Sequence, residues 1–280
     1  MLYLVLAIAS SALVSICMRL SEKHVRGNMV MFTVNYAACL AISRFYMGDV
    51  RLAASEGGMG WAVGLGAVSG FLYLGGFALL QKSIRHNGVI LSSASMKLGG
   101  VLVPVVLAVL LFRERMGGVQ LAGTIIAICA VALMNLERGA VRGDGKKLWL
   151  VILLLVSGLT DAMANVYDKT GAATLKDHYL FYTFLAAMLT ALAAAILKGQ
   201  RPKAADVLCG LIIGIPNYFS ARFLLLALAS VPAVITYPVY SVGTMIVISV
   251  VGLVFFKEKL SGQKKCALLL ILAALVLLNM

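Results

Sequence analysis

Charged residues are scarce in this chain of 280 residues. Lys, Arg, Asp and Glu together make up 12% of it, and only 11 of these residues are acidic. A soluble domain of this size would be roughly a quarter charged. Hydrophobic residues account for 62% of the chain. This composition excludes an ordinary water-soluble fold and predicts an all-α integral membrane protein whose main partner is the lipid bilayer.

Clustered metal-binding or catalytic residues are also missing from the sequence. The five cysteines fall in apolar runs far apart, and the three histidines lie in expected connections. No spacing among them resembles a zinc site, a disulfide framework or a catalytic triad. The basic residues are scattered singly, so the net charge of +13 does not predict nucleic-acid binding. We expect no metal, no cofactor and no enzymatic activity.

Long hydrophobic runs fill most of the chain. A helix needs about 20 apolar residues to cross the hydrocarbon core. Ten segments meet this length, and the connections between them leave no room for a soluble lobe. The first segment lacks a basic start and a cleavage site, so we interpret it as a span rather than a signal peptide. The predicted spans are 2–20, 29–47, 60–81, 88–112, 117–136, 147–167, 178–197, 205–229, 232–256 and 263–280.

The chain repeats itself at a distance of 144 residues. The end of the fourth segment reads FRERMGG (112–118), and the end of the ninth reads FKEKLSG (256–262). The same shift pairs Gly70 with Gly214 and Gly99 with Gly243. A polar stripe repeats as well, from Ser11, Ser15, Arg19 and Glu22 to Ser157, Asp161, Asn165 and Asp168. Spacings of four, four and three place each set on one helix face.

These repeats divide the chain into two halves of five helices, residues 1–136 and 147–280. Because five is odd, the second half must be inverted in the membrane relative to the first. Inverted repeats are the plan of many secondary transporters, which bind substrate near the bilayer midplane between the repeats.

Ten helices in two halves, each with a Phe-basic-Glu-basic junction after its fourth helix, resemble the drug/metabolite transporter superfamily, most closely its EamA branch. The resemblance implies a monomeric or homodimeric carrier that moves small metabolites by alternating access without ATP hydrolysis. It does not define a substrate. The small multidrug resistance relatives use a glutamate in their first helix for protons and cations. The first segment here has no acid at membrane depth, and only Asp161 in the sixth segment offers one.

Lys97 is the first candidate for the substrate site. On a helix it shares a face with Ser93, Gly100 and Pro104, and small or polar residues mark a packed or cavity-lining face. A lysine at the bilayer centre costs roughly 2.5 kcal/mol or more, so it normally faces water or an interior partner. Two roles stay open: contact with substrate, or a structural bond to carbonyls or to an acid.

Arg222 is the second deep cation, with Tyr218 one turn before it. Arginine can hold a carboxylate or phosphate through two parallel hydrogen bonds. The structural alternative is an arginine at a helix end that reaches a lipid headgroup.

Asp161 is the acid that we place well inside a span. It has three possible roles: a coupling site for a proton or another ion, a contact for a substrate amine, or a fixed counter-ion of Lys97 or Arg222.

Uncharged polar residues complete the predicted binding site: Asn165, Asn217, Tyr237, Tyr240 and Ser241. Tyrosines in spans also serve as interfacial anchors, so each tyrosine has a structural alternative. Glu114 and Glu258 are expected to be structural, by bonding backbone groups that open the next helix.

Two arguments disagree on membrane orientation. With a cytoplasmic N-terminus, the cytoplasmic connections would carry six Lys and Arg residues and the opposite face sixteen; Lys97 and Arg222 complete the total of 24. The positive-inside rule therefore predicts both termini outside. The family resemblance implies both termini inside. We follow the charge rule, because the connections are short.

The sequence as a whole predicts a multi-pass secondary transporter of the cytoplasmic membrane. We expect a small metabolite with an anionic group, such as an amino acid or another organic anion, since there are two deep cations and one deep acid. The alternatives are a multidrug or cation exporter and a lipid-carrier flippase. A flippase should show a lateral opening, and a membrane-embedded enzyme would need a cluster that the sequence lacks.

Overall fold

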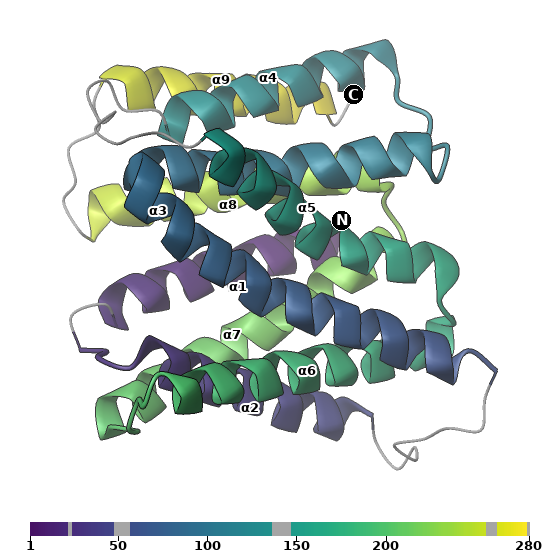
Figure 1. Ribbon diagram of the computed structural model, residues 1–280. Coiled ribbons are helices and arrows are strands. Elements are labelled where there is room, and N and C mark those ends of the chain that lie inside the picture. Colours follow the sequence, from purple (N-terminus) through teal and green to yellow (C-terminus); the bar gives the residue numbers. More distant parts are fainter. Residues whose placement is uncertain (22–23, 48–56, 136–146, 256–261, 279–280) are drawn as a thin grey trace. The chain divides into compact units, whose positions relative to one another are not determined.

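The computed structural model describes residues 1–21, 24–47, 57–135, 147–255 and 262–278. Glu22 and Glu258 lie outside the described residues, as does the side chain of Ser93. The described chain forms α-helices and one 3-10 turn, without a strand (Figure 1). The elements are α1 (Leu2–Ser21), α2 (Asn28–Tyr46), α3 (Met59–Leu110), α4 (Gly118–Asn135), α5 (Lys147–Thr170), η1 (Ala173–Leu175), α6 (Lys176–Leu197), α7 (Ala204–Leu228), α8 (Ala233–Val254) and α9 (Gly262–Leu278).

Seven described helical segments are long and apolar enough to cross a membrane, and two shorter apolar helices accompany them. This confirms an all-helical, multi-pass membrane protein. One expected boundary is wrong: residues 82–87 are helical, so α3 runs through the two spans predicted at 60–81 and 88–112. Gln81 to Arg85 contain no proline and include good helix formers, which explains the continuity. The number ten and the inversion stay predictions.

The chain divides into two compact units, and each unit combines segments from before and after residue 146. Unit 1 consists of Met1–Leu74 and Val166–Ala229, and unit 2 consists of Gly75–Asn165 and Ser230–Met280. In unit 1, α1 packs on α7, and α2 packs on both α6 and α7 (Figure 1). In unit 2, α4 lies beside α9, and α8 contacts both (Figure 1). The two predicted halves are thus interleaved rather than separate bodies.

Small residues set the helix contacts in unit 1, and the same contact occurs twice. A Cβ added to Gly70 of α3 would lie 2.5 Å from the Thr183 carbonyl oxygen of α6, and one added to Gly214 of α7 would lie 2.7 Å from the Asn35 carbonyl oxygen of α2. One turn earlier, Gly66 meets the Tyr179 carbonyl at 2.9 Å and Gly210 meets the Met31 carbonyl at 2.6 Å. The glycines are 144 residues apart and their partners are 148 apart. The two pairs of helices in unit 1 therefore pack through glycines at equivalent positions, and the internal repeat stays a prediction.

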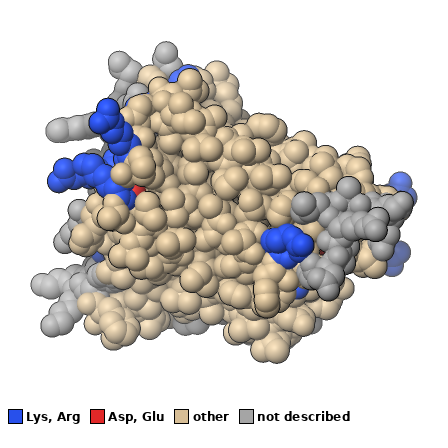
Figure 2. Space-filling view, turned by 90° about the horizontal axis from the view of Figure 1, so that it is seen from below, with Lys and Arg blue, Asp and Glu red and all other residues tan. Residues whose placement is uncertain are grey.

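Charge is distributed as the composition predicts. On the face drawn in Figure 2, uncharged residues predominate, and the visible Lys and Arg side chains lie in a few separate groups. Many large apolar side chains on the described helices are exposed, for example Leu13 at 51% and Ile212 at 50%. Such exposure is favourable only against lipid or another apolar partner, which agrees with a protein embedded in the bilayer.

Candidate functional site

The structure divides the predicted binding residues between the two units. Unit 1 holds Asn217, Tyr218 and Arg222, all on α7. Unit 2 holds Lys97 on α3, Asp161 and Asn165 on α5, and Tyr237, Tyr240 and Ser241 on α8.

In unit 1, Arg222 is engaged by partners of the same unit. Its guanidinium donates to the carboxylate of Asp177 in the first turn of α6 and to the Tyr218 hydroxyl at 2.9 Å. It also lies 4.0 Å from the centroid of the Tyr46 ring, a cation–π contact. The positive charge of Arg222 is therefore balanced inside unit 1. Asp177 had no place in the predicted site, because the sequence put it in a connection.

The neighbours of Arg222 are also bonded internally. Asn217 donates to the side-chain oxygen of Asn35 at 3.3 Å, which links α7 to α2. Tyr218 is completely buried, and its ring packs against Phe184 and Tyr46. The polar groups of this set connect α2, α6 and α7 to one another. This geometry favours a structural role for the set.

In unit 2, α3 and α5 approach closely because glycines meet at their contact. A Cβ on Gly158 of α5 would lie 2.5 Å from the carbonyl oxygen of Gly99 on α3, and a Cβ on Gly99 would meet the carbonyl oxygen of Leu154. Beside this contact, the Ser157 hydroxyl donates to the Met96 carbonyl at 3.2 Å. Only residues without bulky side chains allow two helix backbones to come this near.

The close approach brings Lys97 and Asp161 together. The carboxylate of Asp161 lies against Gly100, where any larger residue would collide with it. Lys97 is one turn before this point on α3 and interacts electrostatically with Asp161. Both side chains are exposed, although their helices are apolar. The tertiary structure thus joins a cation and an acid that are 64 positions apart in the sequence.

Tyr237 fixes the position of Asp161 from a third helix. It is 1% exposed, and its hydroxyl donates to the main-chain carbonyl of Asp161 at 2.7 Å. Tyr240 and Ser241 follow on the same helix and are partly exposed. The structural alternative for Tyr237, an interfacial anchor, does not fit this buried position.

Asn165 lies one turn beyond Asp161 on α5 and is 1% exposed. Among the described residues, neither its amide nitrogen nor its amide oxygen has a hydrogen-bond partner. A buried polar group without a partner costs about 1–3 kcal/mol. Such a group in a native structure needs an explanation, and binding is one of them.

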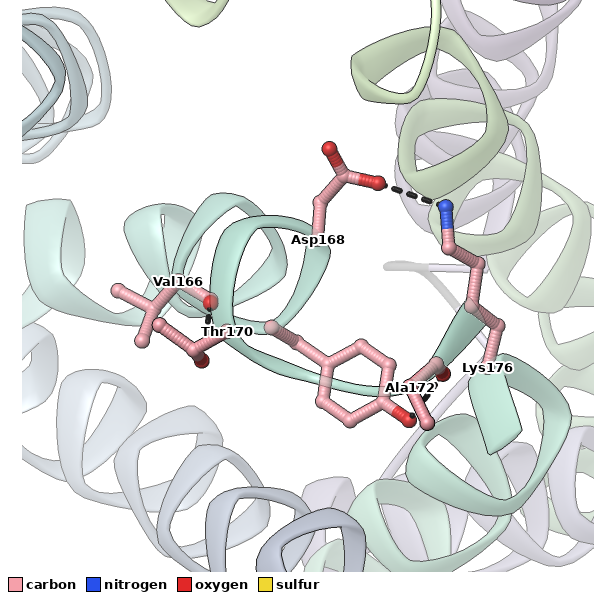
Figure 3. A network of polar contacts seen from close by, with 6 residues as sticks. Val166, Asp168, Thr170, Ala172 and Lys176 are labelled. Atoms are coloured by element: carbon pink, nitrogen blue, oxygen red, sulfur yellow. Dashed lines mark hydrogen bonds and ion pairs between the residues drawn. The ribbon is translucent and has the colours of Figure 1, made fainter. Parts of the chain in front are cut away.

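The polar stripe of α5 ends in a different environment at Asp168. In Figure 3, Asp168 and Lys176 point toward one another, and their carboxylate oxygen and ammonium nitrogen are 2.6 Å apart. Nearby, Thr170 donates to the Val166 carbonyl at 2.6 Å, and Ala172 accepts a bond from the Tyr167 hydroxyl at 3.1 Å (Figure 3). Asp168 therefore stabilises the connection between α5 and α6 within unit 1.

Glu114 has the helix-capping function that its junction predicts, but at another helix. Its carboxylate accepts the main-chain N–H of Val234 at 3.1 Å, at the start of α8. Sequence proximity favoured the next helix, whereas folding brings α8 to this end of unit 2. Among the described residues, no three His, Cys, Asp or Glu side chains gather in a way that could hold a metal ion.

Comparisons with known proteins agree with this picture. Residues 178–271 match the model of the Small Multidrug Resistance protein family, which is less than half of the chain. An uncharacterized protein of Haemophilus influenzae is 22% identical over 205 residues, covering 71% of this chain and 69% of that protein. A protein of known crystal structure aligns with a TM-score of 0.80 at 12% identity, covering 99% of this chain and 94% of that one.

At this level of identity the structural similarity shows the fold alone. The family match and the apolar helices together indicate a multi-pass membrane protein related to small-molecule transporters. Assignment to the EamA branch stays a prediction.

Proposed function

We propose that this protein is a secondary transporter that moves a small metabolite across the cytoplasmic membrane by alternating access. Its substrate site lies on unit 2, around Lys97 and Asp161. The supporting observation is that these two opposite charges are adjacent and exposed on otherwise apolar helices. A charge facing lipid at this depth is costly, so we place both side chains along a water-filled path.

Asp161 is also the residue through which we propose coupling to a proton or another ion. The two halves, 1–136 and 147–280, are the inverted repeats of this transporter, which acts as a monomer or a homodimer. We leave Arg222 out of the proposed binding site, because its guanidinium forms an ion pair with Asp177. Asn217 and Tyr218 are also left out, because they bond to other residues of unit 1.

Transport by purified protein in proteoliposomes tests the proposal. We expect accumulation of a substrate from a metabolite panel, and a large loss of transport in Lys97→Gln and in Asp161→Asn. A matched control is Lys82→Gln, since Lys82 lies on the same helix and its ammonium contacts the Trp149 ring at 3.9 Å. Normal transport by both site variants would refute this site.

A multidrug or cation exporter is the second candidate, and the match of residues 178–271 favours it. Such a protein would bind lipophilic cations at Asp161. Lys97 beside Asp161 opposes a cation, so Lys97→Gln should then strengthen cation binding. A fluorescent lipophilic cation measures this directly: tighter binding by the variant than by the wild type would favour the exporter.

A lipid-carrier flippase is the third candidate. One observation favours it: a groove of about 570 Å³ in unit 1, lined by apolar side chains of α1 and α7 that include Leu13, Ile215 and Phe219. A flippase would respond to lipid-linked substrates and not to water-soluble solutes. The same proteoliposome panel therefore separates it from a metabolite transporter.

A further inference from the structure

We infer that the site at Lys97 and Asp161 takes a zwitterion, a compound with an ammonium and a carboxylate close together as in an α-amino acid. This inference rests on the proposed transport function and narrows it. A plain organic anion, which the sequence favoured equally, is excluded by the charge balance of the folded site.

The charge balance changes because the structure removes one cation. By sequence, Lys97 and Arg222 face Asp161 alone, which leaves a net positive site suited to an anion. In the structure Arg222 is paired with Asp177 in unit 1. Lys97 and Asp161 then form a site of zero net charge. A ligand of one sign would satisfy one of these side chains and leave the other as an uncompensated charge, which is unfavourable at membrane depth.

The geometry leaves each charge available to a ligand. Both side chains are exposed, and between these two described residues there is no direct ion pair, only a longer-range electrostatic interaction. An ammonium group can therefore bind Asp161 while the carboxylate of the same molecule binds Lys97. Gly100 carries no side chain at the point where the Asp161 carboxylate lies against α3.

Two further groups limit how such a ligand can lie. Tyr237 holds the Asp161 segment of α5 against α8 through its 2.7 Å hydrogen bond. Asn165, one turn along α5, has a buried amide without a partner among the described residues. A ligand group that reaches this amide gains hydrogen bonds that no other described residue supplies to it, which favours a polar head over a purely apolar amine or acid.

Binding to matched compounds tests the inference. The purified protein in detergent is titrated with the twenty common amino acids, and with the amine and the carboxylic acid obtained from each by removing one charged group. Binding is followed by thermal shift and calorimetry. We expect at least one amino acid to bind about tenfold or more tightly than either of its halves, because each half leaves one charged hydrogen-bonding group unpaired.

Two variants test which side chain binds the carboxylate of the ligand and which binds its ammonium group. Lys97→Gln should bind the amino acid and its amine equally, and Asp161→Asn should bind the amino acid and its acid equally. The matched controls are Lys82→Gln on α3 and Asp168→Asn on α5, which should keep the preference for the intact amino acid. Asp168→Asn breaks the ion pair with Lys176. This control therefore also shows how destabilisation alone changes the measured preference for the intact amino acid.

The outcomes separate this inference from the proposed function. Binding of an acid or an amine as tightly as its amino acid would overturn the zwitterion and keep a transporter. A preference that survives in both site variants would also overturn it. If no soluble compound of any class binds or is transported, the transporter proposal itself fails.

Discussion

Arg222 and Asp177 form an ion pair inside unit 1, from the middle of α7 to the first turn of α6. Their side chains are only 18% and 30% exposed, so the pair is partly desolvated and each charge needs the other. Tyr218 and Tyr46 complete the surroundings of the guanidinium. This relationship makes Arg222 a residue that holds helices together, and it leaves Lys97 as the cation of the proposed site.

Replacing Arg222 by Met should destabilise the protein rather than its ligand binding. Asp177 would lose its counter-ion and Tyr218 its donor, at a cost of about 1–3 kcal/mol for a charged hydrogen-bonding group. Thermal unfolding in detergent measures the loss, and Asp177→Asn added to the variant should recover part of it. Arg201→Met is the control, since Arg201 is exposed. Reduced ligand affinity at an unchanged melting temperature would show that Arg222 contacts substrate after all.

Asp206 should be a major support of α2. It is 1% exposed, and one of its oxygens accepts the main-chain N–H groups of Arg26 and Gly27 at 2.9 and 3.2 Å, just before α2 begins. A carboxylate here satisfies donors that the helix cannot pair and favours its positive end. Asp206→Ala should cost about 1 kcal/mol or somewhat more. Asp206→Asn keeps an oxygen acceptor and should cost less. Hydrogen exchange at the first residues of α2 is the direct measurement, and unchanged protection there would contradict the cap.

Glycines on α3 should respond to substitution according to their surroundings. Gly70→Ala places a methyl group 2.5 Å from the Thr183 carbonyl and should destabilise by about 1–3 kcal/mol. Gly214→Ala should behave alike, because it sits in the equivalent contact on α7. A Cβ at Gly64 would meet nothing within 4 Å, so Gly64→Ala should be neutral or stabilise the helix by up to about 1 kcal/mol. Equal melting temperatures for Gly70→Ala and Gly64→Ala would rule out the close helix contact.

Tyr237→Phe should lower the affinity of the site for its ligand without abolishing binding. The change removes the hydroxyl that bonds the Asp161 carbonyl and preserves the ring, so we expect a loss of roughly 0.5–1.5 kcal/mol in stability. Ligand affinity should fall a few-fold, because Asp161 is held less firmly. Tyr167→Phe is the comparison variant, because it also removes a hydroxyl that bonds a main-chain carbonyl, that of Ala172 in unit 1. An effect confined to stability, with affinity unchanged, would show that Tyr237 does not position Asp161.

Both termini should lie outside the cytoplasm. The face that carries sixteen Lys and Arg residues would then be cytoplasmic, as the positive-inside rule requires for short connections. A C-terminal alkaline phosphatase fusion should be active, and a C-terminal green fluorescent protein fusion should be dark. The reverse result would favour the orientation that the family resemblance implies.

Much of the architecture could be predicted from sequence because the bilayer imposes simple rules. Length and hydropathy indicated the helices, and the shift of 144 residues paired Gly70 with Gly214, which both lie at close helix contacts in the structure. The connection expected at 82–87 was wrong, because the polar residues between two apolar runs suggested a break, whereas the segment contains no proline and continues the helix. The bond from Glu114 to the start of α8 could not be predicted, because it depends on which helix end lies nearby after folding.

The sequence by itself determined that this is a helical membrane protein, and it predicted that Lys97, Asp161 and Arg222 lie too deep in apolar segments to be ordinary surface charges. That conclusion needs only the cost of placing a charge in hydrocarbon. Only the tertiary structure decided which charges lie near each other. Asp177 pairs with Arg222 because α6 packs beside α7 in unit 1, and Lys97 meets Asp161 because glycines let α3 and α5 approach. Pairing depends on distances between helices, and no spacing along a single helix encodes those distances.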